Sequence, residues 1–363
     1  MTANQTNTTS PTSRKGVSRR LHAADETERL ARVRLSSVTE PGDLRVTSLV
    51  SELGASKVLE YLEAAGDVAA HWAFTIGQEF ALVDPARVLE QAAAKGIRFV
   101  VPGDNEWPRQ LAGLRGAGAR HDRGGEPVGL WVRGNHELHQ LALTSVAVVG
   151  SRAATSYGTE QATEFSHDLA SMGHPVVSGL AYGVDEAAHR GALMAKGTTI
   201  AVLPEGVDRP YPSANASLLD EIANRSLVVS EAPPGTEANR TRFLARNRIV
   251  AGLAEGTLLI EAAHRSGALD TAEWAGNLRR PVMGLPGPVT SAASAGVNQM
   301  IRLGQASAVI DAQDVITDLS ARPDRASAAG QVDESYVPAP VRSQDAPVPG
   351  GSPKSLRQSR FDR

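Results

Sequence analysis

A regular alternation of short apolar runs and amphipathic stretches occupies the sequence from Ser145 to about Leu319. The runs are rich in branched aliphatic residues, and in chain order they are VAVVG (146–150), PVVSG (175–179), TIAVLP (199–204), LVVSE (227–231), TLLIEA (257–262), PVMGLPG (281–287) and SAVI (307–310). Buried strands that alternate with helices are typical of a parallel sheet covered on both faces. The sequence therefore predicts an α/β fold with a doubly wound, mostly parallel, Rossmann-like sheet.

The remaining sequence divides into a helical segment and two polar ends. Residues 25–114 carry apolar residues at helical spacing, broken by turn signals such as TEPGD and LGAS, and predict a small helical N-terminal domain with a connecting strand. The Rossmann-like domain is expected over residues 128–319. Residues 1–24 and 320–363 are rich in Thr, Ser, Pro and charge without apolar periodicity, so we expect disordered tails there.

Composition excludes several classes of site. The chain has no cysteine, which rules out disulfides, thiolate metal ligands and a cysteine nucleophile. The N-terminal MTANQTNTTSPTSRKGVSRR lacks the apolar core of a signal peptide, and no run of about 18 apolar residues occurs. We therefore expect a cytoplasmic protein without membrane spans. A net charge of −3 does not argue against a local basic surface for a polyanion.

The residues that follow the predicted strands indicate an anionic ligand. Ligands of doubly wound sheets bind beyond the carboxyl ends of the strands, where helix N-termini converge. Ser151 and Arg152 follow the first strand, and Ser266 and Gly267 follow the fifth. Glycine permits close backbone approach, serine donates hydrogen bonds, and arginine pairs with phosphate oxygens. Neither a G-x-G-x-x-G dinucleotide motif nor a G-x-x-x-x-G-K-[ST] loop occurs, which argues against NAD and against a P-loop nucleotidase.

The sequence offers weak catalytic or metal candidates. Asp185 and His189 are four residues apart and would share a helix face, as an acid/base or metal pair. Two residues do not make a metal site, and we favour a helix-capping Asp and a packed His. Glu261 and His264 receive the same structural interpretation. Ser151 has no evident base nearby, so we predict no catalytic residue, no metal and no cofactor.

Four arginines lie within nine residues of the segment NRTRFLARNRIVAG, namely Arg240, Arg242, Arg246 and Arg248. We expect a helix from about Phe243 to Leu253 whose apolar face packs on the sheet. Arg246 falls on that face at the first turn, at the rim of the ligand crevice, while Arg242 lies just before it and Arg248 turns toward the flank. Cations at a helix N-terminus oppose the helix dipole, which favours an arriving anion.

Two interpretations of these arginines stay open from the residues alone. They could pair with Glu231, Glu237 or Glu255 in structural ion pairs. They could instead track a phosphate backbone beside Phe243, an arrangement that suits single-stranded nucleic acid, because bases stack on aromatic rings. We favour the second interpretation because the arginines lie where strand ends and helix N-termini meet.

Six blocks in this region resemble the DNA-processing protein A family (DprA, also called Smf). They are VAVVGSRAATSYG, VVSGLAYGVDEAAHRGAL, TIAVLPEGVDRPYPSAN, VVSEAPPG, FLARNRIVAGLAEGTLLIEAAHRSGALDTAEWA and PVMGLPGPVTSAASAGVNQMI, in the family's order. The resemblance implies a non-enzymatic protein that binds single-stranded DNA and helps to load the recombinase RecA onto incoming DNA during natural transformation. It also implies a homodimer formed through the Rossmann-like domain.

The resemblance transfers a DNA-binding site residue by residue. Arg152 of GSR and the arginines of RNR, Arg246 and Arg248, would contact phosphates. Phe243 would line the same pocket, and Arg240 and Arg242 match basic positions loosely. The full predicted set is Ser151, Arg152, Arg240, Arg242, Phe243, Arg246, Asn247, Arg248, Ser266 and Gly267.

Two departures and two rival functions accompany the resemblance. Many members have Phe-Pro before RNR, where this chain has Phe243, Leu244 and Ala245. Many members also carry a winged-helix domain at the C-terminus, for which residues 320–363 are too few and too proline-rich. A phosphoribohydrolase that resembles lysine decarboxylases would share the sheet, but its PGG-x-GT motif is missing. The other rival is a protein-interaction platform whose arginines form structural pairs.

Overall fold

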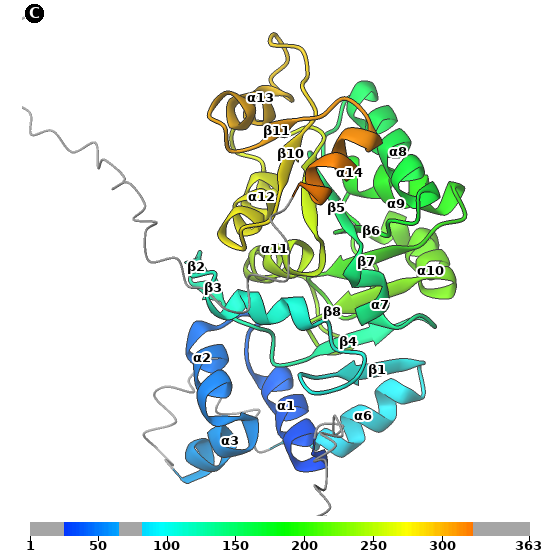
Figure 1. Cartoon of the computed structure of the whole chain (residues 1–363). Helices are drawn as coiled ribbons and strands as arrows, with labels where there is room; N and C mark the ends of the chain where they lie inside the picture. Colours follow the sequence, from blue (N-terminus) through cyan, green and yellow to red (C-terminus); the bar gives the residue numbers. More distant parts are fainter. Residues whose placement is uncertain (1–24, 65–81, 322–363) are drawn as a thin grey trace, which may run out of the picture. The chain divides into compact units, whose positions relative to one another are not determined.

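The computed structural model describes residues 25–64 and 82–321 (Figure 1). The tails predicted over residues 1–24 and 320–363 lie outside the described residues, except that the last described helix ends at Ser320. The division between a helical and a Rossmann-like domain stays a prediction.

Nine strands of the described residues form one sheet in the order β1-β4-β8-β7-β6-β5-β9-β10-β11. Strands β5 to β11 run parallel, while β4 pairs antiparallel with β8 and β1 pairs antiparallel with β4. All seven predicted runs contain one of the parallel strands, which confirms the α/β, mostly parallel fold. The strands of the sheet are β1 (Ile97–Val100), β4 (Leu130–Arg133), β5 (Val146–Val149), β6 (Val176–Ser178), β7 (Thr199–Leu203), β8 (Leu227–Ser230), β9 (Gly256–Leu259), β10 (Val282–Gly284) and β11 (Ser307–Ala308).

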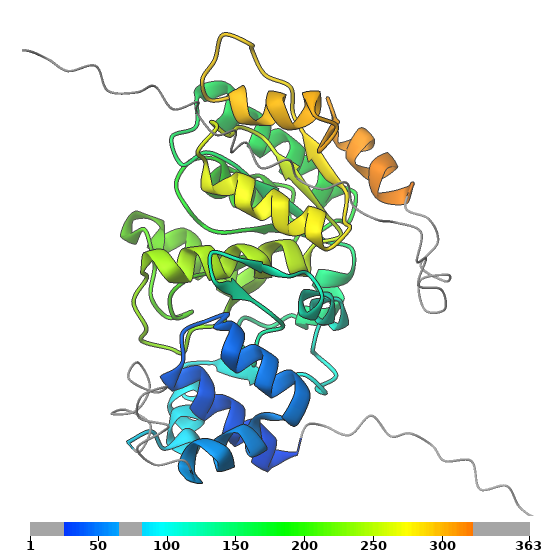
Figure 2. The ribbon, with the colours of Figure 1, turned by 90° about the vertical axis from the view of Figure 1, so that its left-hand side faces the viewer.

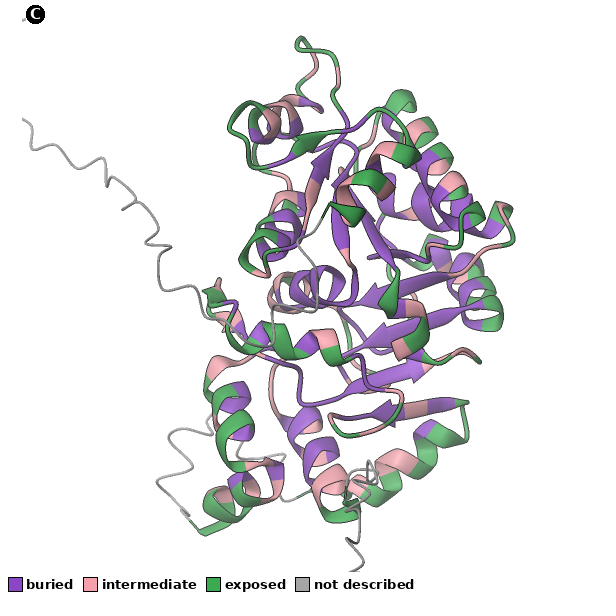
Figure 3. Cartoon of the chain, in the orientation of Figure 1, coloured by how far each residue is buried: buried purple, intermediate pink, exposed green. Residues whose placement is uncertain are grey.

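Alternate side chains of the central strands pack on opposite faces of the sheet, which explains the continuous apolar runs. In β5, Val146 and Val148 face one layer of helices, and Ala147 and Val149 face the other. The first layer holds α8 (Ser156–Ser171), α9 (Val184–Met194), α10 (Ala216–Arg225) and α14 (Ala312–Ser320). The second holds η1 (Arg109–Arg115), α7 (Leu138–Leu143), α11 (Arg240–Leu253), α12 (Gly267–Asn277) and α13 (Ala295–Arg302). Figure 3 shows that the strands are largely buried while these helices expose their outer faces.

The N-terminal helices pack around a small core of their own. The core contains Leu35, Val46, Val50 and Val58. This core is built by α1 (Glu26–Val38), α2 (Leu44–Leu53) and α3 (Ala55–Ala64), whereas α6 (Pro85–Ala93) packs in the core that includes β1. The next element along the chain, β1, is already the edge strand of the large sheet, and a two-stranded hairpin, β2 (Ala119–Arg120) and β3 (Arg123–Gly124), follows it.

The helix that carries the four arginines begins earlier than the sequence analysis predicted. Asn239 caps α11, because its side-chain oxygen accepts a hydrogen bond of 2.8 Å from the N–H of Arg242. The helix therefore starts at Arg240, not near Phe243, and it ends at Leu253 as expected. Helices α11 and α12 pack side by side on the sheet (Figure 2). This arrangement brings their N-terminal ends to one edge of the sheet.

Candidate functional site

A pocket of about 860 Å³ lies beyond the carboxyl ends of β5 and β9. The chain order reverses between these adjacent strands, because β6 to β8 extend the sheet on one side and β9 to β11 on the other. Such a reversal leaves a crevice between the outgoing helices, and ligands of doubly wound folds bind there. The pocket is lined mainly by the β5–α8 turn (residues 149–153), the start of α11 (residues 238–247) and the β9–α12 loop (residues 263–268).

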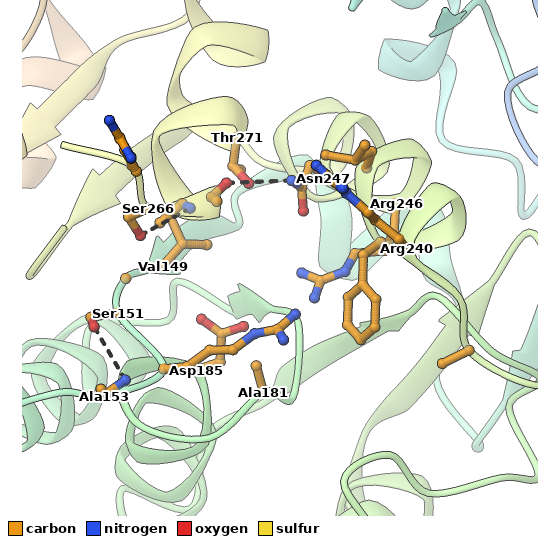
Figure 4. A pocket seen from close by; sticks show the side chains of 18 of the residues that line it. Val149, Ser151, Ala153, Ala181, Asp185, Arg240, Arg246, Asn247, Ser266 and Thr271 are labelled. Atoms are coloured by element: carbon orange, nitrogen blue, oxygen red, sulfur yellow. Dashed lines mark hydrogen bonds between the residues drawn. The ribbon is translucent and has the colours of Figure 1, made fainter. Parts of the chain in front are cut away.

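The structure brings most of the predicted site residues into this pocket. Figure 4 shows Ser151 and Asp185 on one side of the hollow and Arg240 and Arg246 on the opposite side. The predicted residues that line the pocket are Ser151, Arg152, Arg240, Phe243, Arg246, Asn247, Ser266 and Gly267. Arg242 and Arg248 are not among the lining residues. The role of the set in binding DNA stays a prediction.

A cluster of arginine and aromatic side chains forms the mouth of the pocket. The guanidinium carbon of Arg152 lies 4.5 Å from the centre of the Phe243 ring, within the range of a cation–π contact. The ring of Tyr211 meets Phe243 edge-on, with 5.5 Å between the ring centres. Arg152 and Arg240 are exposed, as is Tyr211. Tyr211 was not among the predicted site residues. It reaches the pocket only because the loop between β7 and α10 folds back to the start of α11.

The floor of the pocket contains a buried guanidinium. Arg246 is only 7% exposed, so it does not lie at the rim where the sequence analysis placed it. Its Nη2 donates a hydrogen bond of 3.3 Å to the carbonyl of Gly179. A Cβ at position 179 would lie 1.7 Å from Nη1 of Arg246, so only glycine permits this approach. Burial lowers the pKa of Arg246, whereas the carboxylates of Asp185 and Glu205 favour its charged form.

The two carboxyl groups beside Arg246 are themselves buried. Burial raises the pKa of Asp185, and the positive charge of Arg246 opposes that shift. Burial likewise raises the pKa of Glu205 to about 7, again against the influence of Arg246. The Glu205 oxygens make no hydrogen bond of normal geometry to a described residue, although the backbone N–H groups of Glu205 and Tyr211 favour ionisation. Arg246 in the pocket floor thus lies among buried ionisable groups in a low-dielectric interior.

The N-terminus of α12 forms the far wall of the pocket. Ser266 caps this helix, since its Oγ accepts a hydrogen bond of 3.3 Å from the N–H of Ala268. The amide of Asn247 donates a hydrogen bond of 3.0 Å to Asp270 in the first turn of α12, which ties α11 to α12. Arg265 is exposed and lines the pocket next to the cap. Arg265 was not among the predicted site residues, although it directly precedes the predicted Ser266.

Two of the four arginines on α11 form structural ion pairs. Arg248 was predicted to turn toward the flank of the helix, and there it is fully buried, with its Nη2 2.7 Å from Glu231. Arg242 forms two hydrogen bonds, of 2.8 and 3.0 Å, with the carboxylate of Glu40. For these two residues the structural interpretation holds: Arg248 has the suggested partner Glu231, whereas Arg242 pairs with Glu40, which was not among the suggested partners.

Two of the weak catalytic candidates, His189 and Glu261, make structural contacts. His189 is fully buried, its Nδ1 lies 2.7 Å from the hydroxyl of Thr199, and burial lowers its pKa to about 3. The carboxylate of Glu261 accepts hydrogen bonds from the backbone N–H and the hydroxyl of Thr155, which is the N-cap of α8. Among the described residues, no three His, Cys, Asp or Glu side chains come together as a metal site. In the same part of the chain, no helix is long and apolar enough to cross a membrane.

A sequence model of the family described as DNA recombination-mediator protein A matches residues 98–320, which is more than half of the chain. The chain belongs to this family. The match covers all of the large sheet except the first residue of β1, and every residue that lines the pocket. This finding confirms the resemblance drawn from the six sequence blocks.

Similar proteins of this family come from several bacteria. A putative DNA processing protein DprA of Mycobacterium tuberculosis is 42% identical over 284 residues, covering 78% of this chain and 72% of that protein. DprA of Streptococcus pneumoniae has a crystal structure that matches with a TM-score of 0.64 and 31% identity, covering 81% of this chain and 98% of that chain. DprA of Helicobacter pylori, whose structure concerns its single-stranded DNA binding mode, matches with a TM-score of 0.53 and 29% identity, covering 62% and 95%.

The buried carboxyl group of Glu205 predicts a pH-dependent stability for this recombination-mediator protein. Its pKa in the folded protein, about 7, lies above the ordinary value of 4.5. The ionised carboxylate therefore lowers the free energy of unfolding. This loss of stability is fully present above pH 7 and disappears as the pH falls toward 4.5. We expect Glu205→Gln to raise the free energy of unfolding at pH 8 by up to about 3 kcal/mol, and by less at pH 5. Urea unfolding at both pH values measures this. Glu221→Gln, at an exposed site on α10, is the control, and an equal effect of Glu205→Gln at both pH values would contradict the assignment.

The buried pair of Arg248 and Glu231 predicts a large loss of stability when one partner is removed. We expect Glu231→Ala to lower the free energy of unfolding by about 3–5 kcal/mol, because it leaves a buried guanidinium without its counter-charge. Removing Glu221 from its exposed pair with Arg225 should cost less than about 1 kcal/mol. Urea unfolding of both variants measures these losses. If the free energy of unfolding falls by a similarly small amount in the two variants, the charge of Arg248 is compensated by groups other than Glu231.

Proposed function

We propose that the pocket between β5 and β9 binds single-stranded DNA. The observation that carries this proposal is the contact of Arg152 with Phe243 at the pocket mouth, with Tyr211 packed against the same ring. Proteins that bind single strands combine aromatic rings, on which bases stack, with cations that track the phosphates. A mouth built from exposed arginine and aromatic side chains meets both requirements.

The electrostatics of the pocket support a phosphate backbone as the ligand. Arg152, Arg240 and Arg265 are exposed along its lining, and the capped N-terminus of α12 adds backbone N–H groups with a partial positive charge. Buried Arg246 forms the floor beneath them, where Asp185 offsets its charge. The net charge of the whole chain, −3, hides this local concentration of cations.

We further propose that the chain acts without catalysis, as a cytoplasmic homodimer that helps to load RecA onto incoming single strands during natural transformation. Its family, a recombination mediator by description, and a relative characterised with single-stranded DNA support this role. The lining residues support a binding site, since they include no histidine among the described residues, and the Ser151 hydroxyl accepts a hydrogen bond from the N–H of Ala153.

Salt dependence tests the role of the exposed arginines. We expect affinity for a single-stranded oligonucleotide to fall with salt, with log K changing by about 0.7 per log unit of salt for each neutralised phosphate. Arg152→Ala should weaken binding and reduce this slope by about one phosphate. Fluorescence anisotropy from low to high salt measures both quantities.

Arg225→Ala on α10 is the matched control for Arg152→Ala, because Arg225 pairs with Glu221 and does not line the pocket. It should leave affinity and slope unchanged. Binding that does not respond to salt, or equal losses in the two variants, would refute the pocket as the phosphate site.

Stacking on Phe243 predicts a different signature. We expect Phe243→Leu to weaken binding of a single strand by about 10-fold, since a stacked base contributes about 1–3 kcal/mol. The salt slope should stay at the wild-type value, because no phosphate contact is lost. Anisotropy titrations of Phe243→Leu and Arg152→Ala separate the two contributions, and a reduced slope for Phe243→Leu would count against a stacking role.

A further inference from the structure

Helix α11 is held by the N-terminal helical region on sides that do not face the pocket. Residues 240, 243, 244, 246 and 247 line the pocket, while Arg242 and Arg248 point to the loop between α1 and α2. The helix is therefore both the wall of the site and the contact surface for a region of the chain that lies about 200 residues earlier, since Glu40 and Arg242 are 202 positions apart.

The first contact fixes the first turn of α11. The carboxylate of Glu40 pairs with Arg242 through both oxygens, and Nη1 of Arg242 also donates a hydrogen bond of 2.6 Å to the carbonyl of Glu237. The side chains of Arg242 and Glu40 are only 20% and 28% exposed, so water screens the pair incompletely. Glu40 also places a negative charge beside the N-terminal turn, where the helix dipole favours it.

The second contact holds α11 further along the helix, at Arg248. Gly42 adopts a φ of +68°, and a Cβ at this position would lie 3.1 Å from Nε of Arg248. The carbonyl of Gly42 accepts a hydrogen bond of 2.9 Å from the N–H of Gly124, and the carbonyl of Gly124 in turn accepts one of 3.3 Å from Arg248. The loop between α1 and α2 thus lies against α11 at both Arg242 and Arg248.

We propose that Glu40 is a positioning residue for the pocket, and that the N-terminal helical region serves to hold the first turn of α11. Arg240 and Phe243 belong to that turn, and an isolated first turn frays because its N–H groups lack partners within the helix. The Glu40 pair keeps both side chains oriented before a ligand arrives, which lowers the entropy lost on binding. The effect on affinity rests on the proposed binding of single-stranded DNA.

The test compares Glu40→Gln, Arg242→Gln and the double variant. Because each single change breaks the same pair, each should weaken single-strand binding by a similar factor, about 3- to 10-fold, and the double variant should be no worse than either. The melting temperature should change little. Glu63→Gln, which breaks the exposed pair with Arg34 in the same helical region, is the control and should bind like the wild type.

Amide hydrogen exchange supplies a readout that needs no DNA. Residues 243–246 should exchange faster in Glu40→Gln and Arg242→Gln than in the wild type, while α12 keeps its protection. If the wild type fails to bind a single strand, the proposed function fails, and the exchange data alone judge the positioning role. Unchanged exchange in both variants would overturn that role.

Opposite effects of the two variants on affinity would also overturn the proposal. If Glu40→Gln strengthens binding while Arg242→Gln weakens it, Arg242 contacts the DNA directly and Glu40 competes with the phosphate. Additive losses in the double variant would likewise show that the two residues act separately.

Discussion

Two buried guanidinium groups on one helix are the constraint on which the site depends. Arg246 and Arg248 are nearly removed from water, and a buried charge is tolerated only with compensation nearby. Asp185 supplies it for Arg246, and Glu231 supplies it for Arg248. Because these carboxyl groups come from separate strand ends and loops, α11 has few other ways to pack, and its orientation over the sheet is set by charge as well as by apolar contact.

The position of α11 in turn decides what the pocket can bind. With the helix held from beneath and from its flank, Arg240 and Phe243 are left facing the crevice between β5 and β9, opposite Arg152. The switch point of the sheet supplies the hollow and the N-terminus of α12 supplies backbone donors. The burial of this one helix thus presents side chains to the pocket that suit a phosphate backbone with unstacked bases.

The fold and the place of the site were predictable from the sequence, whereas the partners of individual charges were not. The alternation of apolar runs with amphipathic stretches identified all seven parallel strands. The rule that ligands bind beyond the carboxyl ends of such strands predicted where the pocket lies. Asn239 carried a helix-capping signal that would have given the true start of α11. No local pattern, however, pairs Arg242 with Glu40 from 202 residues away, or distinguishes Arg246 in the pocket floor from Arg248, which is buried against Glu231. Those outcomes depend on loops brought together only by tertiary packing.

The most direct test of the account is photo-crosslinking of a single-stranded oligonucleotide that carries 5-iodouracil, followed by mass spectrometry of the protein. Iodouracil reacts with aromatic side chains that stack on it, and the account predicts crosslinks to Phe243 or Tyr211 that an excess of unlabelled single strand abolishes. Crosslinks confined to aromatic residues outside the pocket, such as Tyr157 or Tyr182, would contradict it.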